Sequence, residues 1–367
     1  MDDANKKIRV CFISPKAYPI FNPQVESVFG GAEVDTYMIA TELAKDENFE
    51  VSFIVADYGQ PQEEVRENIH ILKSLNFKQN PLTGACKIWK ALKRADADIY
   101  MMKTASPGVP LILYFCQKYN RQFVYKNANQ GECDGTYLKH HLILGRLFAR
   151  SLKKAARVIT QNQQDQENLK QRFNIDSIVI VNGHRISEST ESKKETILWV
   201  GRSAAVKGPR RFLELAKALP QEPFVMICQR ATSDTGYDDL KADAVKIDNL
   251  QFIERVPFGE MDHYFERAKV LVNTSDSEGF PNTFIQACKA STAILTFAVN
   301  PDGFLDKHKC GICCGGDERR MAEQLGEMLR ENRYQHFGNN GLNYVKDQHD
   351  ISKVIEQYKN IFVDGVR

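Results

Sequence analysis

Three short stretches of this chain bring glycine together with charged or amide side chains. The most specific is the run Ser275–Ala287, SDSEGFPNTFIQA, in which Glu278 follows a strand-like run and Gln286 comes eight residues later. Pro281 suits the opening turn of a helix, whose free N–H groups attract phosphate, while a glutamate and a glutamine can hold ligand hydroxyls. The run therefore predicts a site for a phosphorylated, polyhydroxylated ligand. A capped helix with a solvated Glu278 is the alternative.

A second stretch, LWVGR at Leu198–Arg202, ends in a cation and is followed by Lys207, Gly208 and Pro209. Arg202 offers a planar guanidinium fork and Lys207 a compact charge, and both kinds of cation bind phosphate. Pro209 fits a first helical turn. These residues predict a phosphate-binding loop, with two solvated surface cations as the alternative.

The third stretch, FGGAE at Phe29–Glu33, precedes a stretch with apolar residues at helical spacing. Paired glycines let a backbone approach a ligand closely and adopt positive φ, and the start of a helix offers N–H groups to an anion. The stretch lacks the spaced glycines of the dinucleotide-binding fingerprint. We therefore expect Gly30 and Gly31 to lie at an anion site or, as the alternative, in a plain tight turn.

The elements that would position these residues alternate along the chain. Short apolar runs that read as buried strands are separated by longer stretches with helical periodicity. This rhythm is typical of an α/β protein with parallel sheets covered by helices, in which ligands bind at the carboxyl ends of the strands. The predicted strands are Arg9–Ser14, Glu50–Ala56, Ile69–Ser74, Asp98–Lys103, Gln122–Asn127, Arg157–Gln161, Ser177–Val181, Ile197–Val200, Phe224–Cys228, Leu250–Ile253, Val270–Asn273 and Ala293–Phe297.

The polar segment 182–196, rich in Ser, Glu and Lys, interrupts this rhythm and predicts a linker. We expect two Rossmann-like, doubly wound domains, residues 1–183 and 196–349, joined by residues 184–195 and facing each other across a cleft. Residues 350–367 read as a helix that could belong to either domain, and we expect it to pack back on the first. The length of 367 residues agrees with two domains, because a single core rarely grows beyond about 300 residues.

Composition excludes several classes of protein. Lys and Arg total 49 against 47 Asp and Glu, and a net charge of +2 argues against a protein that coats nucleic acid. No apolar window is long enough to span a bilayer, and the start MDDANKKIRVCFISP lacks the pattern of a signal peptide. Nine scattered cysteines favour a reducing compartment over a disulfide framework. We therefore expect a cytoplasmic protein.

Three of the cysteines, Cys310, Cys313 and Cys314, have a spacing that looks like part of a metal site. No second pair of Cys or His lies nearby in the sequence, so a closed zinc site would lack ligands. We expect no structural metal and assign Cys313 and Cys314 to a short strand.

The order GGAE, then VGR with a lysine five residues later, then EGFPNTFIQA resembles the retaining GT-B glycosyltransferases of glycosyltransferase family 4. The resemblance extends over essentially the whole chain and implies the same two-domain architecture. It departs from the family pattern at one position. The family commonly has two glutamates separated by seven residues, and here Gln286 stands in the second place. Glutamine keeps an acceptor and adds a donor, so binding of a ribose hydroxyl stays an expectation.

The resemblance implies a role for each matching residue. Arg202 and Lys207 would neutralise the diphosphate of the donor. Glu278 would bind hydroxyls of the transferred sugar, and Gln286 would meet the ribose. The other residues implied at the donor site are Gly30, Gly31, Gly279, Phe280, Pro281, Asn282 and Thr283.

The implied activity is transfer of a sugar from a nucleoside-diphosphate sugar to a hydroxyl of a glycan or lipid-linked acceptor, with retention of configuration. Similar enzymes need no metal or cofactor, because cations and a helix N-terminus stabilise the departing diphosphate, which can itself deprotonate the acceptor. One alternative is a nucleotide-sugar hydrolase or epimerase of the same fold. Another is a binding module that has lost catalysis, which only Gln286 favours.

Two features concern the acceptor. The loop Asn127–Gly135 follows a predicted strand, and by resemblance Glu132 or Asp134 is the candidate near the reacting centre, with a hydrogen-bonded turn as the alternative for each. The segment Lys139–Arg157 holds six Lys and Arg, no acid, and apolar residues at helical spacing. A basic amphipathic helix of this kind suits contact with an anionic membrane surface. The alternative is a helix packed on the sheet with a solvated basic face.

Overall fold

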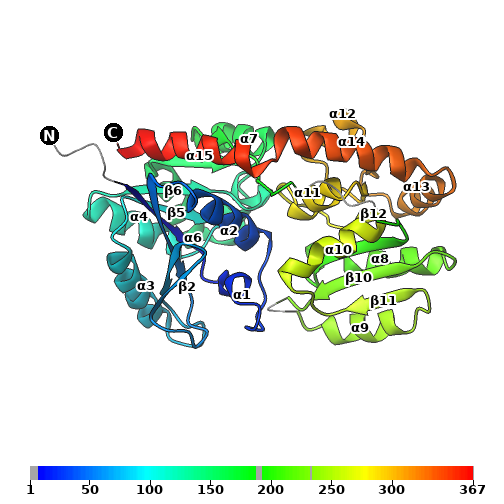
Figure 1. The fold of residues 1–367 in the computed structure, drawn as a ribbon, viewed down its shortest axis with the longest axis horizontal. Coiled ribbons are helices and arrows are strands. Elements are labelled where there is room, and N and C mark those ends of the chain that lie inside the picture. The colour runs from blue at the N-terminus through cyan, green and yellow to red at the C-terminus, as the bar shows by residue number, and fades with distance from the viewer. Residues whose placement is uncertain (1–6, 187–191, 232–233, 367) are drawn as a thin grey trace. The chain divides into compact units, whose positions relative to one another are not determined.

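The computed structural model describes residues 7–186, 192–231 and 234–366, which form two compact units, each with its own sheet (Figure 1). The first unit takes the chain up to Arg185 and again from Ile351 onward, and the second runs from Ile186 to Asp350. Both units are α/β structures with mainly parallel sheets, so the predicted fold class is confirmed.

The sheet of the first unit has the strand order β3-β4-β2-β1-β5-β6-β7-β8, and every pairing is parallel except that of β3 with β4. The chain winds outward from β1 through β2 and β4, then returns to the centre and winds the other way from β5, so the winding reverses between β1 and β5. The strands are β1 (Ile8–Ile13), β2 (Phe49–Val55), β3 (Glu63–Arg66), β4 (Ile69–Lys73), β5 (Ile99–Lys103), β6 (Gln122–Lys126), β7 (Arg157–Thr160) and β8 (Ile178–Val179).

Helices cover both faces of this sheet. Cys11 and Ile13 of β1 join a core cluster with residues of α3, α4 and α6, whereas Phe12 between them packs against Phe362 of α15. The helices of the unit are α1 (Tyr18–Phe21), α2 (Gly31–Leu43), α3 (Pro81–Ala95), α4 (Gly108–Lys118), α5 (Thr136–His140), α6 (Leu142–Lys154), α7 (Gln163–Phe173) and α15 (Ile351–Val366), with a 3-10 turn at Gln130–Glu132.

The sheet of the second unit is entirely parallel, with the order β11-β10-β9-β12-β13-β14, and its winding reverses between β9 and β12. The strands are β9 (Thr196–Arg202), β10 (Phe224–Gln229), β11 (Leu250–Ile253), β12 (Ala268–Asn273), β13 (Ala293–Thr296) and β14 (Gly311–Cys313). The helices are α8 (Pro209–Ala218), α9 (Tyr237–Val245), α10 (Met261–Arg267), α11 (Asn282–Lys289), α12 (Phe304–His308), α13 (Glu318–Arg330) and α14 (Arg333–Gln348), with 3-10 turns at Ala205–Lys207, Phe258–Glu260 and Pro301–Gly303.

The structure contains one strand that the apolar pattern did not predict. β3 has the sequence EEVR and pairs only with β4, antiparallel, at the edge of the first sheet. A strand at a solvated edge needs no continuous apolar run, because one side and much of its surface face water. The short strand expected around Cys313 and Cys314 is β14, which ends at Cys313.

The basic segment Lys139–Arg157 is not one helix, which corrects the prediction. α5 ends at His140, His141 has non-helical backbone angles (φ −132°, ψ 70°), and α6 follows from Leu142, while Arg157 begins β7. Gly145 explains the break. A Cβ at this position would lie 2.7 Å from the Cα of Leu138, so the glycine lets α5 fold back closely against α6.

The two units divide between Arg185 and Ile186, inside the predicted linker 184–195, of which residues 187–191 lie outside the described residues. The carbonyl of His184 accepts a hydrogen bond from the backbone of Ile351 in the first unit. Lys194 already belongs to the second unit, where its ammonium donates to the carbonyl of Ala290 at 2.6 Å. The last helix, α15, contacts α2 and β1, and Lys359 in it forms an ion pair of 2.7 Å with Asp46.

Within the described part of the chain, no helix is long and apolar enough to cross a membrane. Its nine cysteines are free thiols, and Cys310 and Cys314 are buried.

Candidate functional site

Two of the three stretches come together in the second unit, the one that contains Arg202 and Lys207 and the one that contains Glu278. They meet at the carboxyl ends of β9 and β12. These strands are neighbours at the point where the winding reverses, and the helices that follow them, α8 and α11, belong to two different core clusters of the unit. Such a reversal opens a crevice in doubly wound sheets and is where their ligands bind. β9 ends at Arg202, and the loop after β12 carries Glu278.

Glu278 is held by three side chains. One carboxylate oxygen accepts from the Lys207 ammonium at 2.5 Å, and the other accepts from Ser275 Oγ at 2.6 Å and from Asn273 Nδ2 at 2.8 Å. The side chain is only 14% exposed. Burial by itself would raise the pKa of Glu278, but the positive charge of Lys207 and these hydrogen bonds outweigh it and hold the pKa below its ordinary value. Glu278 is therefore an ionised acceptor at the edge of the sheet.

Hydrogen bonds join the two loops and fix Lys207 beside Glu278. Thr274 Oγ donates to the carbonyl of Lys207 at 2.7 Å and accepts from the indole of Trp199 at 2.8 Å. The backbone N–H of Asp276 donates to the carbonyl of Val206 at 2.9 Å. Because these bonds hold the backbone on both sides, the ion pair lies on a rigid support.

Gly208 permits this close approach of the loops. Its φ of +55° lies in the left-handed region, and a Cβ here would meet the carbonyl of Thr274 at 2.5 Å. Pro209 then opens α8, as predicted. Sequence reasoning missed Arg211, whose guanidinium donates to the carbonyl of Thr274 at 2.8 Å and pairs with Asp276 at 2.9 Å. The only signal was a further cation after Pro209.

Arg202 differs from Lys207 in having no partner among the residues that the structure describes. It is the last residue of β9 and is exposed. Within the described residues, no carboxylate or carbonyl accepts a hydrogen bond from its guanidinium. An unpaired cation beside a paired one leaves positive charge available to an anionic ligand. The structure thus brings Lys207 and Glu278 into contact and leaves Arg202 free on the neighbouring strand end.

The helix predicted after Glu278 is α11, which begins at Asn282 with Pro281 as the preceding cap residue. Thr283 is the second helical residue, and Gln286 is the fifth and is 8% exposed. Phe280, also buried, packs against His349 with ring centroids 4.9 Å apart and an interplanar angle of 37°, and so anchors the loop. Gly279 lies between these anchors and Glu278, and its φ is outside the left-handed region.

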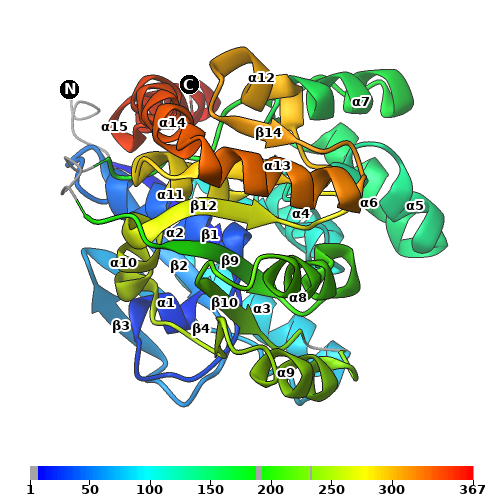
Figure 2. The same ribbon diagram turned by 90° about the vertical axis from the view of Figure 1, so that its right-hand side faces the viewer.

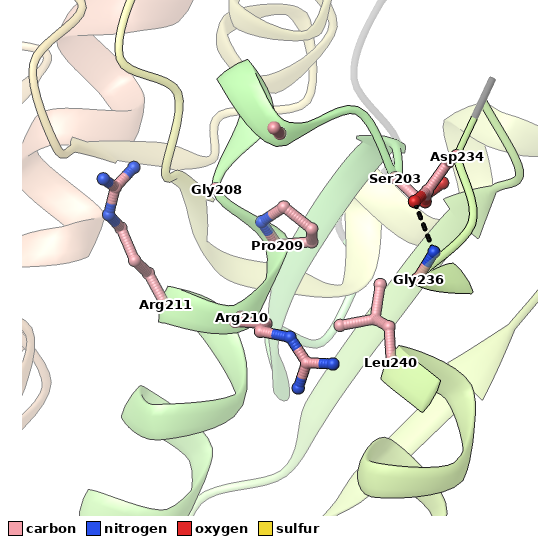
Figure 3. Close-up of a pocket in the computed structure, with 9 residues that line it drawn as sticks. Ser203, Gly208, Pro209, Arg210, Arg211, Asp234, Gly236 and Leu240 are labelled. Carbon is pink, nitrogen blue, oxygen red and sulfur yellow. Dashed lines mark hydrogen bonds between the residues drawn. The ribbon is translucent and has the colours of Figure 1, made fainter. Parts of the chain in front are cut away.

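A pocket of about 370 Å³ adjoins the start of α8 (Figure 3). It lies between the loops after β9 and β10 and is lined by Ser203, Arg210, Asp234 and Leu240 among others. Figure 3 shows Arg210 and Arg211 leaving the first turn of α8 in different directions. Arg202, Lys207 and Glu278 do not line this pocket, so it adjoins the candidate site without containing it.

In the first unit, Glu132 lies inside the fold rather than at its surface. Its two carboxylate oxygens accept from the backbone N–H groups of Ala105 (3.0 Å) and Ala128 (2.8 Å), from Asn129 Nδ2 (3.0 Å) and from the Tyr125 hydroxyl (2.7 Å). Burial raises the pKa of Glu132 above its ordinary value, although these hydrogen bonds oppose the shift. This geometry matches the hydrogen-bonded turn that was the alternative for this residue.

Asp134 takes part in the same loop at its surface. Its carboxylate accepts from the backbone N–H of Thr136 at 2.8 Å and so caps the start of α5. Glu132 also holds the loop after β5, where Thr104 has a φ of +83° that a β-branched residue rarely adopts. Both acids of this loop thus order the backbone at the carboxyl edge of the first sheet.

The paired glycines do not use the positive φ that glycine permits. Gly30 is extended (φ −138°) and precedes α2, which begins at Gly31, and neither residue is in the left-handed region. The backbone N–H of Gly30 donates to the Glu33 carboxylate at 2.7 Å. Gly30 is extended because it caps the helix. In this conformation its backbone N–H points to the Glu33 carboxylate, which accepts the hydrogen bond.

A buried ion cluster holds α2 to the sheet, and sequence reasoning missed it. Asp35 pairs with Lys103 at 2.7 Å and with Lys126 at 2.9 Å, and all three side chains are at most 3% exposed. Burial, with Lys103 nearby, lowers the pKa of Lys126 to about 7, although Asp35 opposes the shift. Because Lys103 and Lys126 end β5 and β6, the cluster fixes the helix that begins at Gly31.

Among the described residues, no group of three or more His, Cys, Asp or Glu side chains is arranged to hold a metal ion. The aspartates Asp96 and Asp98 near β5 pair instead with Arg9, at 2.6 and 2.9 Å.

Comparison with known proteins agrees with this arrangement. Residues 181–344 match the family model described as Glycosyl transferases group 1, and residues 29–187 match the model described as Glycosyltransferase Family 4. A protein of Haemophilus influenzae, described as an uncharacterized glycosyltransferase, is 22% identical over 348 residues, which cover 90% of this chain and 96% of that protein.

Two solved structures show the same fold over almost the whole chain. Sucrose-phosphate synthase from Thermosynechococcus elongatus superposes with a TM-score of 0.80 at 15% identity, covering 98% of this chain and 99% of that one. WaaG, a glycosyltransferase involved in lipopolysaccharide biosynthesis, superposes with a TM-score of 0.71 at 15% identity, covering 96% and 99%. At this identity the likeness concerns the fold.

Proposed function

Because the chain belongs to the group 1 and family 4 glycosyltransferases and has their GT-B fold, we propose that it transfers a sugar from a nucleoside-diphosphate sugar to an acceptor hydroxyl with retention of configuration. The observation that carries this proposal is the 2.5 Å contact between Lys207 and the ionised Glu278 at the reversal point of the second sheet. That edge offers an acceptor for sugar hydroxyls next to cations for a diphosphate.

The donor would bind as follows. Arg202, which has no partner in the described structure, and Lys207 neutralise the diphosphate, and the N-terminus of α11 adds the positive end of its helix dipole. Glu278 accepts hydroxyls of the transferred sugar, and the mostly buried Gln286 meets the ribose. These cations stabilise the negative charge that grows on the leaving diphosphate, which supports transfer without a metal ion.

The acceptor would be a hydroxyl of a glycan or a lipid-linked glycan, and the reaction would form part of polysaccharide or glycoconjugate synthesis in the cytoplasm. The leaving phosphate takes the acceptor proton on the face from which it departs, so configuration is retained without a covalent intermediate. Lipopolysaccharide biosynthesis, the process named for WaaG, supports a lipid-linked acceptor. A lipid-linked acceptor lies in a membrane, so the protein must contact the membrane surface to reach it. We assign this membrane contact to the segment Lys139–Arg157.

Thermal unfolding in the presence of UDP, GDP, ADP, TDP and their sugars tests the donor site without knowledge of the acceptor. A ligand at about 100 times its dissociation constant stabilises the folded chain by about 2.7 kcal/mol. We expect one base to raise the unfolding temperature clearly above the others. No shift with any member of the panel would contradict donor binding.

Product analysis separates the proposed transfer from its alternatives. With the donor identified above, transfer requires added acceptor, and NMR of the new glycosidic bond reports its anomeric configuration. Free sugar or an epimerised donor formed without acceptor would instead indicate a hydrolase or epimerase, and donor binding without turnover a non-catalytic module. Unchanged turnover in EDTA is expected, and its loss would contradict metal independence.

A further inference from the structure

Four helices of the first unit, α3, α4, α5 and α6, contain no aspartate or glutamate. The other large helices of the unit do carry acids, such as Asp35 in α2 and Asp165 in α7. Apart from the four-residue α1, only these four helices of the unit lack acids among the described residues. Together they carry ten cations, Lys87, Lys90, Lys93, Arg94, Lys118, Lys139, Arg146, Arg150, Lys153 and Lys154.

The four helices form one continuous surface, which we call the basic face. α3 contacts α4, α4 contacts α6, and α5 packs on α6, and Figure 2 shows α4, α5 and α6 grouped at one side of the first unit. Of the ten cations, only Arg94 has a carboxylate partner within the described residues, Glu63 at 3.4 Å. The acids that flank the helices are engaged, since Asp96 pairs with Arg9 and Arg121 and Asp134 caps α5. The positive charge of the face is therefore uncompensated.

A ridge of apolar side chains crosses the basic face at the start of α6. Leu142, Ile143, Leu144 and Leu147 are 63%, 76%, 39% and 40% exposed. Four such residues within six positions form a patch of the kind that marks an interaction site. We call these four residues the apolar ridge.

Aromatic side chains continue the pattern on α3 and α4. Trp89 contacts Tyr114 and Tyr119, which are 58% and 37% exposed. The ammonium of Lys118 lies 5.8 Å from the ring of Trp89, and that of Lys93 lies 5.6 Å from the ring of Tyr119. Tryptophan and tyrosine next to lysine are typical of surfaces that meet the headgroup region of a bilayer, because these rings are apolar with one polar end.

We propose that the basic face docks on an anionic phospholipid bilayer, with the apolar ridge inserted at the boundary between headgroups and acyl chains. Nine unpaired cations complement the negative surface potential of such a bilayer, and the ridge supplies the apolar contact that electrostatics alone lacks. A second copy of the chain does not fit, because two basic faces repel each other. Nucleic acid would match the charge but leaves the ridge unexplained.

This inference deepens the membrane contact assigned to Lys139–Arg157, extending it to α3 and α4. It rests on the proposed function only in placing a lipid-linked acceptor at the same surface. Bilayer binding itself requires neither a bound donor nor sugar transfer. The docking proposal and the proposed function can therefore fail separately.

Vesicle flotation of the full chain tests the docking. The probes are vesicles of phosphatidylcholine alone and vesicles that mix phosphatidylcholine with phosphatidylglycerol. We expect binding to the mixed vesicles, weakened by added salt, and little binding to the neutral ones. No binding to mixed vesicles, or equal binding to both kinds, would overturn the proposal.

Two sets of variants locate the contact. The ridge variant Leu142→Gln/Ile143→Gln/Leu144→Gln should lower partition into mixed vesicles about tenfold or more, because three inserted side chains lose their apolar contact. Its control, Val65→Gln/Val245→Gln, removes apolar side chains that are 61% and 71% exposed elsewhere and should leave partition unchanged. An equal loss in both would overturn the role of the ridge.

The charge variant Arg146→Gln/Arg150→Gln/Lys153→Gln should likewise lower partition about tenfold or more. The control Lys7→Gln/Lys45→Gln/Lys170→Gln removes three exposed cations of the same unit outside the four helices and should have little effect. Because all these side chains are exposed, circular dichroism and nucleotide-induced thermal shifts should be those of the wild type. A chain that binds vesicles but no nucleotide would refute the proposed donor site and leave the docking intact.

A DNA duplex serves as the competing polyanion in the same assays. Salt-sensitive binding of the duplex that is as tight as vesicle binding and indifferent to the ridge variant would assign the face to nucleic acid and overturn the proposal. Preference for the mixed vesicles, lost in the ridge variant, supports it.

Discussion

Glu132 in the first unit and Glu278 in the second are two glutamates with little solvent exposure, each in a loop at the carboxyl edge of a sheet, yet their pKa values shift in opposite directions. Glu132 is surrounded by neutral donors, and burial raises its pKa in spite of them. At Glu278 burial acts in the same sense, but the Lys207 ammonium at 2.5 Å and two hydrogen bonds outweigh it and lower the pKa. Proximity to one cation thus separates a glutamate that orders a loop from one that is charged and able to exchange partners with a ligand.

The largest expected effect is on transfer at the charged glutamate. Glu278→Gln keeps the size of the side chain but removes its charge, so we expect transfer to fall by about 100-fold or more, a loss of about 3 kcal/mol of transition-state stabilisation. The measurement is release of nucleoside diphosphate in the presence of acceptor. Glu214→Gln on the exposed face of α8 is the control and should keep full activity. Undiminished transfer by Glu278→Gln would contradict the assignment.

The cations beside Glu278 should determine affinity for the diphosphate. Arg202→Met and Lys207→Met should each weaken binding of the nucleoside diphosphate by about 1.5–3 kcal/mol, because each removes a charged hydrogen bond. Calorimetric titration with the free diphosphate measures this. Lys217→Met, further along α8 and paired with Glu214, should bind it like the wild type. Equal affinities in all three variants would place the diphosphate elsewhere.

Glu132 should affect stability rather than chemistry. In Glu132→Gln, one carboxylate oxygen that accepts hydrogen bonds becomes an NH₂ group facing donors, so we expect a loss of about 1–3 kcal/mol in the free energy of unfolding. Urea denaturation measures this loss, and Asp134→Asn on the surface of the same loop should lose less. Retained stability together with abolished transfer would instead make Glu132 the reacting-centre residue that the family resemblance allowed.

The smallest effect should be in how the two glutamates respond to pH. The folded-state pKa of Glu132 is raised, so its stabilising contribution is complete below the unfolded value of about 4.3 and is lost as the pH rises through the folded pKa. The folded-state pKa of Glu278 is lowered, so its contribution is present above about 4.3 and is lost as the pH falls through the folded pKa.

Differences between wild type and variant isolate the two groups, because other titrations cancel. From acidic towards neutral pH, the stability deficit of Glu132→Gln should shrink and that of Glu278→Gln should grow. Urea denaturation at a series of pH values measures both slopes. Slopes of the same sign would contradict the contrast between the two sites.

Much of this fold was predictable because the central strands are buried on both faces and so appear as apolar runs, as in Val270–Asn273 of β12. β3 could not be found in this way, since an edge strand of sequence EEVR carries no such run. The break at His141 depends on the contact of Gly145 with Leu138, which is a matter of tertiary packing rather than of local periodicity. α15 lies in the first unit, on which residues 350–367 were expected to pack.

The candidate site was predictable as far as loops follow strands. Arg202 ends β9, and Lys207 and Glu278 stand in the loops after β9 and β12, so the topology brings them to one edge. Arg211 was not predictable, because its role depends on a carbonyl 63 residues away in the sequence. The surroundings of Glu132 and Asp134 were also out of reach, since the four donors around Glu132 include a backbone group after β5 and a tyrosine within β6.

The position of α15 has a consequence for the order of assembly during synthesis. Phe362 in this last helix is fully buried and contacts Phe12 of the first strand, and Tyr358 lies against Lys126 of the buried ion cluster. The chain must therefore emerge from the ribosome as far as residue 362 before the first unit can complete its core, although most of that unit emerges first. The second unit, continuous in sequence, can finish folding earlier, which reverses the usual N-terminal-first order of vectorial folding.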